Sequence, residues 1–506
     1  MPDRIGLTRD VLDRARRSRD ARFDGKFFVA VTSTRIYCRP ICPAKLSQDA
    51  NVRYYATAAE AAAAGFRPCL RCRPEAAPGS PAWLGTSAVV RRALRIIQDG
   101  ALDESSVEAV ALRLGVGPRQ LSRLFTRHLG ASPTAIAQTR RLHFAKQLLD
   151  ETPLPITEIA LASGFRSVRR FNDAFKATYK RPPREIRKRM RTGRTEALDA
   201  EIRLRLAYRP PYDWPQVLRF LEKRAIRGVE RIEADAYVRT VRTATGSAVL
   251  QIRPVKATAA LELCIRGGES SDLLPLSSMA RRMFDLSADP SRIATLLKRD
   301  PLMSPLIVER PGLRIPGTWG AFEAGVRAII GQQISVAAGR TLLTRLVERT
   351  GERVAPDEHH LSHLFPTPAS VAAADLEALG LPRARAHALL GFARAVRDRV
   401  VTFDESGTEL IRALSALPGV GPWTAGYIAL RGLGEPDAFP SADLILRREA
   451  ARGDIALTAQ ELEARAELWR PFRGYAVLHL WEASAQRTSD RSFEVRRQPV
   501  PALRRG

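Results

Sequence analysis

The sequence predicts a multidomain protein that is mainly α-helical and contains two α+β parts. Its 506 residues exceed what one hydrophobic core holds, so three or four domains are expected. Two cysteine pairs mark a small domain near the N-terminus, and a helix-turn pattern occurs twice in the part that follows. β-branched apolar runs then give way to a helical pattern that continues almost to the end. We expect domains at residues 1–78, 79–192, 193–284 and 285–506.

The chain is strongly basic, and its charge is uneven. The net charge of +27 and a pI near 10.9 indicate a polyanionic partner. Residues 1–200 carry 37 basic against 19 acidic residues, a balance of +18, which leaves +9 for residues 201–506. No apolar run is long enough to span a bilayer, and residues 1–20 lack the apolar core of a signal peptide. We therefore expect a cytoplasmic protein of the bacterial nucleoid with no membrane partner.

Four of the five cysteines form two close pairs, Cys38-x3-Cys42 and Cys69-x2-Cys72. In a reducing cytosol this spacing is better explained by a tetrahedral metal than by disulfides, so we expect one Zn²⁺ held by four thiolates in a small α+β domain. A purely structural zinc site is the alternative. Basic residues that suit a phosphate backbone crowd the same window: Arg35, Arg39, Lys45, Arg53, Arg67, Arg71 and Arg73.

The residues between the cysteines narrow this choice. The segments Phe23–Val31, Thr34–Cys42 and Ala64–Cys72 closely resemble the N-terminal domain of the Ada family, over roughly residues 8–76. The resemblance implies repair of methylphosphotriesters in DNA, with Cys38 as the methyl acceptor. A metal-bound cysteine is held as the nucleophilic thiolate. Methylation would change the formal charge of the cluster from −2 to −1 and so should tighten binding to DNA.

An internal repeat follows the cysteine window. Val107–Val116 recurs as Ile156–Phe165, and Leu121–Phe125 recurs as Phe171–Phe175. In each copy an apolar helix ends at a glycine that turns the chain into a second helix, which is the helix-turn-helix layout. A long helix, Pro133–Leu149, should join the two copies.

This double helix-turn-helix resembles the DNA-binding domain of the AraC family, over roughly residues 87–190. The recognition helices would be about Pro118–Arg127 and Ser167–Lys176, and RNA polymerase becomes an expected partner. The basic run from Lys176 to Arg194 is either a DNA clamp or a solvated linker. The leucine and phenylalanine residues of these helices should form the core. Polar side chains positioned for bases or phosphates are Arg119, Gln120, Arg123, Arg166, Arg169, Arg170 and Asn172.

Residues 201–284 predict an α+β domain with an antiparallel sheet. Pro215–Ala225 has a helical pattern, and Cys264 reads as a small buried hydrophobic residue. The expected strands lie within Ala234–Val241, Gly246–Val255 and Ala259–Ile265.

The helical part contains the segment Leu417–Ala425, with Gly419 and Gly421 in a turn between helices. Two glycines there let backbone N–H groups approach a phosphate without a side chain in the way. This is the helix-hairpin-helix pattern of DNA binding without sequence preference. The spacing from this hairpin to Phe439–Leu444, which contains Asp443, resembles that of the helix-hairpin-helix DNA glycosylases. In that family the catalytic aspartate lies at this distance from the hairpin.

Further segments resemble the AlkA type of 3-methyladenine DNA glycosylase over roughly residues 201–490. They are Pro210–Trp214, Arg310–Gly317, Arg327–Val336 and Tyr475–Trp481. The resemblance implies Asp443 as the catalytic carboxylate and Trp423, Tyr427 and Trp481 as the aromatic base pocket. It places Gln333 at the position of the wedge that fills the gap left by a flipped nucleotide. That wedge is typically leucine, so this chain departs from the family pattern.

The chemistry agrees with excision of alkylated purines. A purine methylated on N3 or N7 is cationic and already a good leaving group, so one carboxylate can stabilise the sugar cation and position water. Aromatic rings favour a flipped cationic base through cation–π attraction. The alternatives are that Asp443 only caps the helix that starts near Leu444 and that Trp481 and Tyr427 are core aromatics.

Absent residues restrict the chemistry. Lys298 is the last lysine, so the helical domain has no amine near Asp443 and should be monofunctional. No cysteine follows Cys264, which excludes an iron–sulfur cluster, and no Pro-Cys-His-Arg segment of an O-6-methylguanine repair domain occurs. His359, His360 and His363 read as surface histidines without a metal.

The preferred function is a fusion of methyl sensor, transcriptional activator and alkylbase glycosylase, with double-stranded DNA as partner. Two alternatives stay open. One is a regulator whose glycosylase-like half only binds lesions, and the other is a glycosylase whose zinc domain is only structural.

Overall fold

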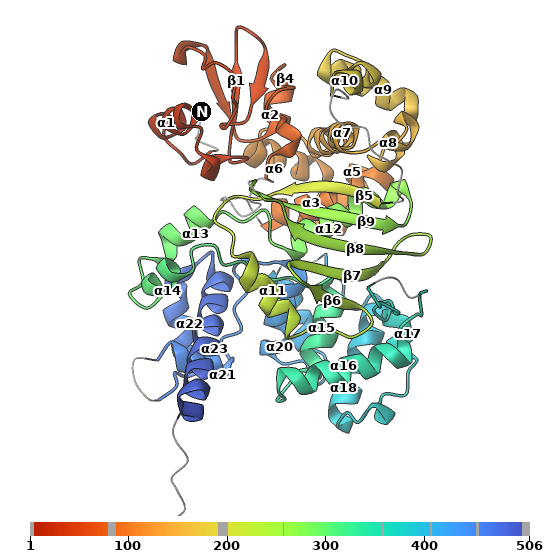
Figure 1. Cartoon of the computed structure of the whole chain (residues 1–506), viewed down its shortest axis with the longest axis vertical. Helices are drawn as coiled ribbons and strands as arrows, with labels where there is room; N and C mark the ends of the chain where they lie inside the picture. The colour runs from red at the N-terminus through yellow and green to blue at the C-terminus, as the bar shows by residue number, and fades with distance from the viewer. Residues whose placement is uncertain are drawn as a thin grey trace, which may run out of the picture.

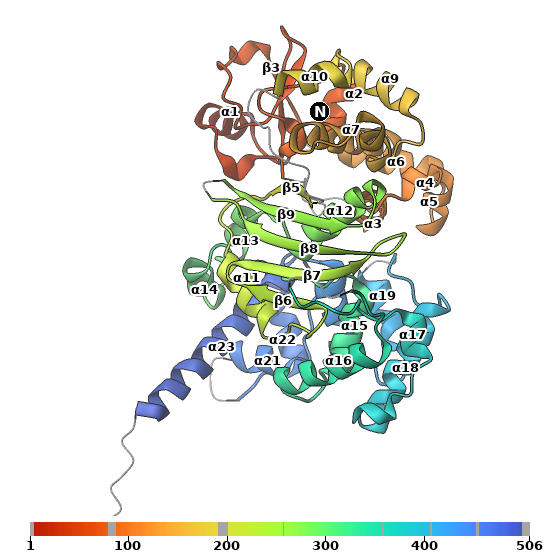
Figure 2. The same cartoon turned by 45° about the vertical axis from the view of Figure 1, so that its right-hand side comes forward.

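The computed structural model describes residues 5–78, 88–190, 201–256, 258–355, 359–404, 407–451 and 455–497. Figures 1 and 2 show three levels along the long axis of the molecule. The N-terminal domain and the helix-turn-helix domain lie at one end, a five-stranded sheet lies in the middle, and a helical domain forms the other end. The expected multidomain, mainly helical architecture with two α+β parts is confirmed.

The N-terminal domain is a small α+β unit whose four-stranded sheet has the order β3-β1-β2-β4. β1 is buried along its whole length and pairs antiparallel with β2 and β3, whereas β2 and β4 are parallel. The elements are α1 (Arg9–Ser18), η1 (Ala21–Phe23), β1 (Phe28–Val31), β2 (Ile36–Cys38), η2 (Asp49–Asn51), β3 (Val52–Tyr55), α2 (Ala58–Ala63), β4 (Arg67–Pro68) and η3 (Pro74–Ala76).

The helix-turn-helix domain follows the predicted repeat. Gly115 and Gly164 have φ values of 68° and 79°, the left-handed region that glycine tolerates, and each turns a first helix into a recognition helix. The recognition helices are α6 and α9, and the long connecting helix is α7. The elements are α3 (Ala88–Gln98), α4 (Ala101–Glu104), α5 (Val107–Arg113), α6 (Pro118–Leu129), α7 (Pro133–Glu151), α8 (Ile156–Ala162), α9 (Val168–Tyr179) and α10 (Pro183–Met190).

The middle level is an antiparallel sheet, as predicted, and its strand order is β5-β9-β8-β7-β6. Cys264 is buried in it, as expected. Alternating exposure along β8 matches a sheet with one covered face. The elements are β5 (Glu201–Ala207), α11 (Trp214–Glu222), β6 (Glu230–Glu233), β7 (Ala236–Arg242), β8 (Ser247–Pro254), β9 (Ala260–Gly267), η4 (Ser270–Asp272) and α12 (Leu273–Met283).

The remaining residues form the helical domain. Within the described residues, no helix combines the length and the apolar character that crossing a membrane requires. The elements are α13 (Pro290–Leu297), α14 (Met303–Glu309), α15 (Ala321–Ile330), α16 (Val336–Thr350), α17 (Pro368–Ala372), η5 (Glu377–Leu379), α18 (Arg383–Arg397), α19 (Gly407–Ser415), α20 (Pro422–Tyr427), η6 (Ile428–Gly432), α21 (Leu444–Glu449), α22 (Ala459–Ala466), η7 (Glu467–Trp469) and α23 (Arg473–Arg497).

The domains pack against one another through shared hydrophobic cores. One core runs from Leu148 and Phe171 of the helix-turn-helix domain through Leu204 and Leu250 of the sheet to Phe284 and beyond. The domain limits expected at residues 192 and 284 therefore stay a prediction, because packing continues across both. Buried ion pairs, Arg239–Glu323 and Arg327–Glu230, join the sheet to the helical domain.

Candidate functional sites

The four cysteines of the N-terminal domain converge at one point. Cys38 ends β2, and Cys69 and Cys72 follow β4, its parallel neighbour, so the sheet brings the two pairs together. The four Sγ atoms lie within 4.8 Å of one another. A tetrahedron with zinc–sulfur bonds of about 2.3 Å needs sulfur atoms roughly 3.8 Å apart, so the cluster fits a single Zn²⁺.

The same crowding makes a cation necessary if all four groups are to be thiolates. The hydrogen bond with Cys42 is the main reason that the pKa of Cys38 is raised, and the same contact is the main reason that the pKa of Cys42 is lowered, to about 7. Neighbouring thiols thus share protons instead of ionising together. Cys38 is half-buried, whereas the other three cysteines of the cluster are buried. The Cys38–Cys42 pair, with Cys42 9% exposed, is therefore the less buried side of the cluster.

The basic residues around the cluster divide into two groups. Arg39 and Arg73 are not available to a phosphate, which corrects part of the sequence prediction. Arg39 pairs with Asp24, and Arg73 pairs with Glu75 and Asp150. The exposed members are Arg35, Lys45, Arg53 and Arg71, while Arg67 is half-buried.

The recognition helices present polar side chains outward and apolar ones inward. Leu121, Phe125, Phe171 and Phe175 are fully buried, and Leu124 packs from a partly buried position against the core that contains Leu121 and Phe125. Ser167 caps α9 by accepting a hydrogen bond from the Arg170 backbone N–H. The predicted DNA-facing residues are all exposed: Arg119, Gln120, Arg123, Arg166, Arg169, Arg170 and Asn172.

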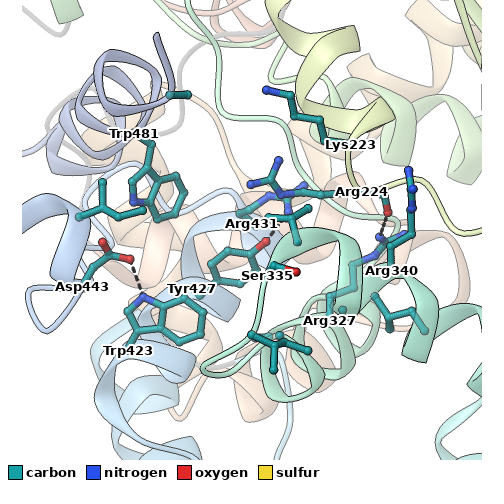
Figure 3. A pocket seen from close by; sticks show the side chains of 18 of the residues that line it. Lys223, Arg224, Arg327, Ser335, Arg340, Trp423, Tyr427, Arg431, Asp443 and Trp481 are labelled. Atoms are coloured by element: carbon teal, nitrogen blue, oxygen red, sulfur yellow. Dashed lines mark hydrogen bonds between the residues drawn. The ribbon is translucent and has the colours of Figure 1, made fainter. Parts of the chain in front are cut away.

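A cavity of about 800 Å³ lies in the helical domain near the edge of the sheet domain. It collects residues from the segment just after α11 and from α15, α16, α20, η6, α21 and α23 (Figure 3). Asp443, Trp423, Tyr427 and Trp481, the four residues predicted for catalysis and base binding, all line it. Gln333 does not. Figures 1 and 2 place α16 and recognition helix α9 toward opposite ends of the molecule.

Both oxygens of Asp443 accept hydrogen bonds. Oδ1 accepts from the backbone N–H of Leu446 at 3.0 Å, so Asp443 caps α21. Oδ2 accepts from Nε1 of Trp423 at 2.7 Å (Figure 3). The cap anticipated for Asp443 is thus present, and the second oxygen is tied to an aromatic ring of the cavity. The carboxylate is held in one orientation, with the side chain facing the cavity.

The three aromatic rings form a continuous wall. Trp423 and Tyr427 stack with centroids 5.5 Å apart, and Trp481 lies 6.2 Å from Tyr427. The Tyr427 hydroxyl accepts a hydrogen bond from Arg431. Burial alone would raise the pKa of Tyr427, yet the charges of Arg431 and Arg224 lower it overall. Tyr427 and Trp481 pack against the hydrophobic cores from half-buried positions and also line the cavity.

Sequence reasoning missed the cationic wall of this cavity, which consists of Lys223, Arg224, Arg327, Arg340 and Arg431. Lys223 and Arg224 come from the sheet domain, so no motif of the helical domain signals them. The i, i+4 spacing of Tyr427 and Arg431 in one helix would have been a usable signal. Lys223 also qualifies the lysine argument, because an amine lines the cavity after all, although Figure 3 shows it on the wall opposite Asp443.

The hairpin at Gly419 and the wedge position at Gln333 lie close together, because Gln332 bonds to the hairpin. Gly419 has φ +77°, and a Cβ there would lie 2.5 Å from the Cβ of Ala388, so only glycine fits. Gln332 donates from its side-chain amide to the Gly419 carbonyl at 3.0 Å and to Thr424 at 2.9 Å. Its neighbour Gln333 is exposed and has φ +55°, at the turn between α15 and α16. Gly421 is exposed with open space around it.

The histidine prediction is wrong for one of the three residues. His359 is buried: its Nδ1 lies 2.8 Å from Glu233 and its Nε2 lies 3.3 Å from Arg266. These partners explain why a polar side chain tolerates burial, since each ring nitrogen has one. His360 is exposed, and His363 is half-buried beside Ser362.

Four family models match the chain in the order of these sites. They are the metal binding domain of Ada (residues 12–75), a helix-turn-helix domain (110–189), the AlkA N-terminal domain (203–320) and the HhH-GPD superfamily of base excision DNA repair proteins (326–473). The probable bifunctional transcriptional activator/DNA repair enzyme AlkA of Mycobacterium tuberculosis H37Rv is 40% identical over 92% of this chain and 95% of its own length. The chain belongs to this Ada–AlkA fusion family.

Each half also matches a relative by itself. DNA-3-methyladenine glycosylase 2 of Escherichia coli K12 is 36% identical over 54% of this chain and 95% of its own length. The bifunctional transcriptional activator/DNA repair enzyme Ada of the same organism is 37% identical over 29% of this chain and 40% of its own length. A solved 3-methyladenine DNA-glycosylase of Archaeoglobus fulgidus covers 55% of this chain and 96% of its own, with a TM-score of 0.47 and 19% identity. The fusion family thus combines zinc-binding, regulatory and glycosylase domains that act on DNA.

Proposed function

We propose that this protein accepts methyl groups from DNA methylphosphotriesters on Cys38, activates transcription in response, and excises alkylated purines of the 3-methyladenine class. The convergence of four thiols around Cys38, the least buried residue of the cluster, carries the first part. The carboxylate of Asp443 at an aromatic cavity carries the last part.

The methyl transfer is a direct displacement. The Sγ thiolate of Cys38 attacks the methyl carbon, the bond from that carbon to the phosphate oxygen breaks, and the oxygen leaves with the electron pair as a phosphodiester. Cys38, Cys42, Cys69 and Cys72 would hold a Zn²⁺ whose positive charge keeps the sulfurs deprotonated. The exposed arginines of the window can hold the flanking phosphates, and Arg39 fixes the loop through Cys72.

Methylation would act as a charge switch. It removes one negative charge from the cluster, and the phosphate backbone then repels the domain less. We infer tighter promoter binding through residues 1–190 and, as its consequence, recruitment of RNA polymerase. Because the effect is electrostatic, the gain in affinity should shrink as salt rises.

In the glycosylase half, Asp443 stabilises the sugar cation while water attacks, and the aromatic wall holds the flipped base. Two guanidinium groups of the cationic wall are engaged by other partners. Arg327 pairs with Glu230 and Glu323, and Arg431 donates to the carbonyls of Pro316 and Gly317. Exposure of a cationic base to the rings then remains favourable. Lys223 lies on the far wall, so we propose hydrolysis without backbone cleavage.

One experiment tests both chemistries. The full chain is incubated with DNA carrying methylphosphotriesters and 3-methyladenine, then Cys38 is examined by peptide mass spectrometry and released bases are counted. We expect a 14-Da addition on Cys38 only, together with free 3-methyladenine and an intact backbone. Cys38→Ala should remove the addition and leave base release unchanged. Methylation of Cys69 with Cys38 unmodified would refute the acceptor, and lesion binding without release would support a purely regulatory role.

A further inference from the structure

The N-terminal domain is fastened to the glycosylase half by one buried arginine. Arg209, just after β5, is fully buried. Its Nε donates to the backbone carbonyl of Asp24 at 2.9 Å, and its Nη2 lies 3.4 Å from the carbonyl of Pro78. Its Nη1 donates to the carbonyls of Ser287 at 2.8 Å and Ala288 at 3.2 Å. One guanidinium thus joins the N-terminal domain to the segment before α13.

A second contact lies beside it. The Lys26 ammonium is 2.7 Å from the Asp289 carboxylate, and the two side chains are only 11% and 2% exposed. Between these contacts the chain passes through Gly25, at φ +71°. A Cβ on Gly25 would lie 2.0 Å from the Pro78 carbonyl oxygen and 3.0 Å from Nη2 of Arg209. The segment that Arg209 contacts can therefore pack this tightly only with glycine at position 25.

Asp24, whose backbone carbonyl accepts a hydrogen bond from Arg209, is connected by further hydrogen bonds to Cys72 of the cluster. The Asp24 carboxylate accepts from the Arg39 guanidinium, with Nε to Oδ1 at 2.9 Å and a second bond from Nη2. Arg39 in turn donates from Nη1 to the Cys72 carbonyl at 3.2 Å, and its backbone N–H donates to the Cys72 Sγ at 3.3 Å. Arg209, Asp24, Arg39 and Cys72 therefore form an unbroken series of hydrogen bonds across the domain boundary.

We propose that Arg209, a residue of the glycosylase half, is a positioning residue for the thiolate cluster of the N-terminal domain. It fixes Asp24, and Asp24 orients the guanidinium that holds the Cys72 loop and aims the Arg39 N–H at sulfur. The inference rests on the proposed function only in calling this cluster the methyl acceptor. The acceptor site then includes a part of the glycosylase half.

Physical chemistry supports a positioning role over simple packing. Burial lowers the pKa of Arg209 to about 10, so keeping this charge inside the protein is costly unless its donors are used. Groups that hydrogen-bond to metal ligands control how firmly a metal is held, and their loss commonly weakens binding 10- to 100-fold. Because coupling between sites is reciprocal, the occupied cluster should also stabilise the docking of the two halves.

The test uses the full chain loaded with zinc, and in parallel with ¹¹³Cd as a spectroscopic probe. Arg209→Gln removes the charge and most donors, and Arg209→Lys restores the charge with fewer donors. The control is Arg203→Gln, an exposed arginine of the same strand region that pairs with Glu201. We measure the rate of zinc transfer to a chelator and the ¹¹³Cd chemical shift. For Arg209→Gln we expect about tenfold faster release and a shifted resonance, with Arg209→Lys intermediate and Arg203→Gln unchanged.

A second variant decides the matter if Arg209→Gln does not fold. Asp289 caps α13 by accepting from the Arg292 N–H, and asparagine caps equally well, so Asp289→Asn removes only the charge that pairs with Lys26. We expect roughly threefold faster zinc release in this variant. Wild-type release and an unshifted ¹¹³Cd resonance in the folded Asp289→Asn and Arg209 variants would overturn the proposal. Neither readout needs methyl transfer, so failure of the acceptor assignment remains a separate result.

Discussion

The thiolate cluster takes all its ligands from residues 38–72, whereas the lining of the base cavity comes from residues between 223 and 485. Two short turns and one sheet pairing are enough to form the cluster. The cavity needs the segment after α11 in the sheet domain to lie against α15, α16, α20, η6, α21 and α23 of the helical domain. A site built locally depends on its metal, while an assembled site depends on the packing of whole domains.

The two sites also treat charge differently. The cluster gathers negative charge that a bound dication must balance, and Arg39 adds one N–H to a sulfur. The cavity gathers positive charge, of which Arg327 pairs with Glu230 and Glu323 while Arg431 donates to the carbonyl of Gly317. Removing the metal ion should therefore collapse the cluster, whereas removing one partner of an arginine should change the cavity only slightly.

Removal of zinc should give the largest effect and the sharpest contrast. Chelation leaves four thiols that cannot all ionise, and a domain as small as residues 12–75 depends on its metal. We expect complete loss of methyl acceptance and loss of hydrogen-exchange protection in β1 and β2. Base release should stay near its starting rate because the cavity contains no residue of this domain. An equal loss of base release would show that the halves are not separable.

Asp443→Asn should give the next largest effect, a fall in base release of roughly 100-fold with binding of lesion DNA nearly intact. Asparagine has one acceptor oxygen where aspartate uses two, so it can keep the cap on α21 but not also accept from Trp423. Single-turnover base release and lesion binding would be measured together. Near wild-type release would mean that capping is the main role of Asp443.

A matched variant separates the effect of the Asp443 charge from the effect of its hydrogen bond with Trp423. Trp423→Phe removes the Nε1 donor, so the pair Trp423→Phe and Trp423→Phe/Asp443→Asn has no donor to leave unsatisfied. If the carboxylate charge is what matters, Asp443→Asn should cost a similar factor in both backgrounds. If the ring position is what matters, the second substitution should have little further effect.

The cluster was predictable to the residue because metal coordination relates spacing directly to geometry. Cys38, Cys42, Cys69 and Cys72 had to meet, whatever the rest of the chain did. Burial of Leu121 and Phe175 followed from helical periodicity in the same way. The pairing of Arg39 with Asp24 was not predicted, because it depends on a loop conformation that no spacing encodes.

The cavity was predictable only where the helical motifs reach it. Trp423, Tyr427 and Asp443 stand within one hairpin and the segment after it, so their meeting was expected. Lys223 and Arg224 enter from another domain, and burial of His359 depends on Glu233 of β6 across the interface. Contacts between domains follow from the packing of surfaces, and a single sequence does not display that packing.

If Gln333 acts as the wedge, Gln333→Gly should lower base release from duplex DNA by about tenfold, because no side chain would then fill the gap left by a flipped base. Glycine accepts the φ of +55° without strain, so folding should be unchanged or slightly improved. Release from a single-stranded substrate, which has no stack to hold open, should be unaffected. Gln333→Leu serves as the control and should retain duplex activity. Equal losses on both substrates would mean that Gln333 is not a wedge.

The smallest expected effect concerns acid and again compares the halves. Desolvation, together with the charge of Lys146, lowers the pKa of His143 to about 4, and its Nε2 lies 3.0 Å from the Tyr37 hydroxyl beside the cluster. The folded state therefore binds fewer protons than the unfolded state between about pH 4 and 6.5, so this stability is complete above 6.5 and is lost as the pH falls. Between pH 7.5 and 5.5 the wild type should lose about 1 kcal/mol more unfolding free energy than His143→Gln, which keeps a polar partner for Tyr37. Denaturant unfolding, combined with hydrogen exchange of the α7 amides, would measure this loss of unfolding free energy.

His479 provides the same comparison in the glycosylase half, because burial also lowers its pKa to about 4. An acid response confined to His479 would show that Tyr37 and His143 do not hold the N-terminal domain in place.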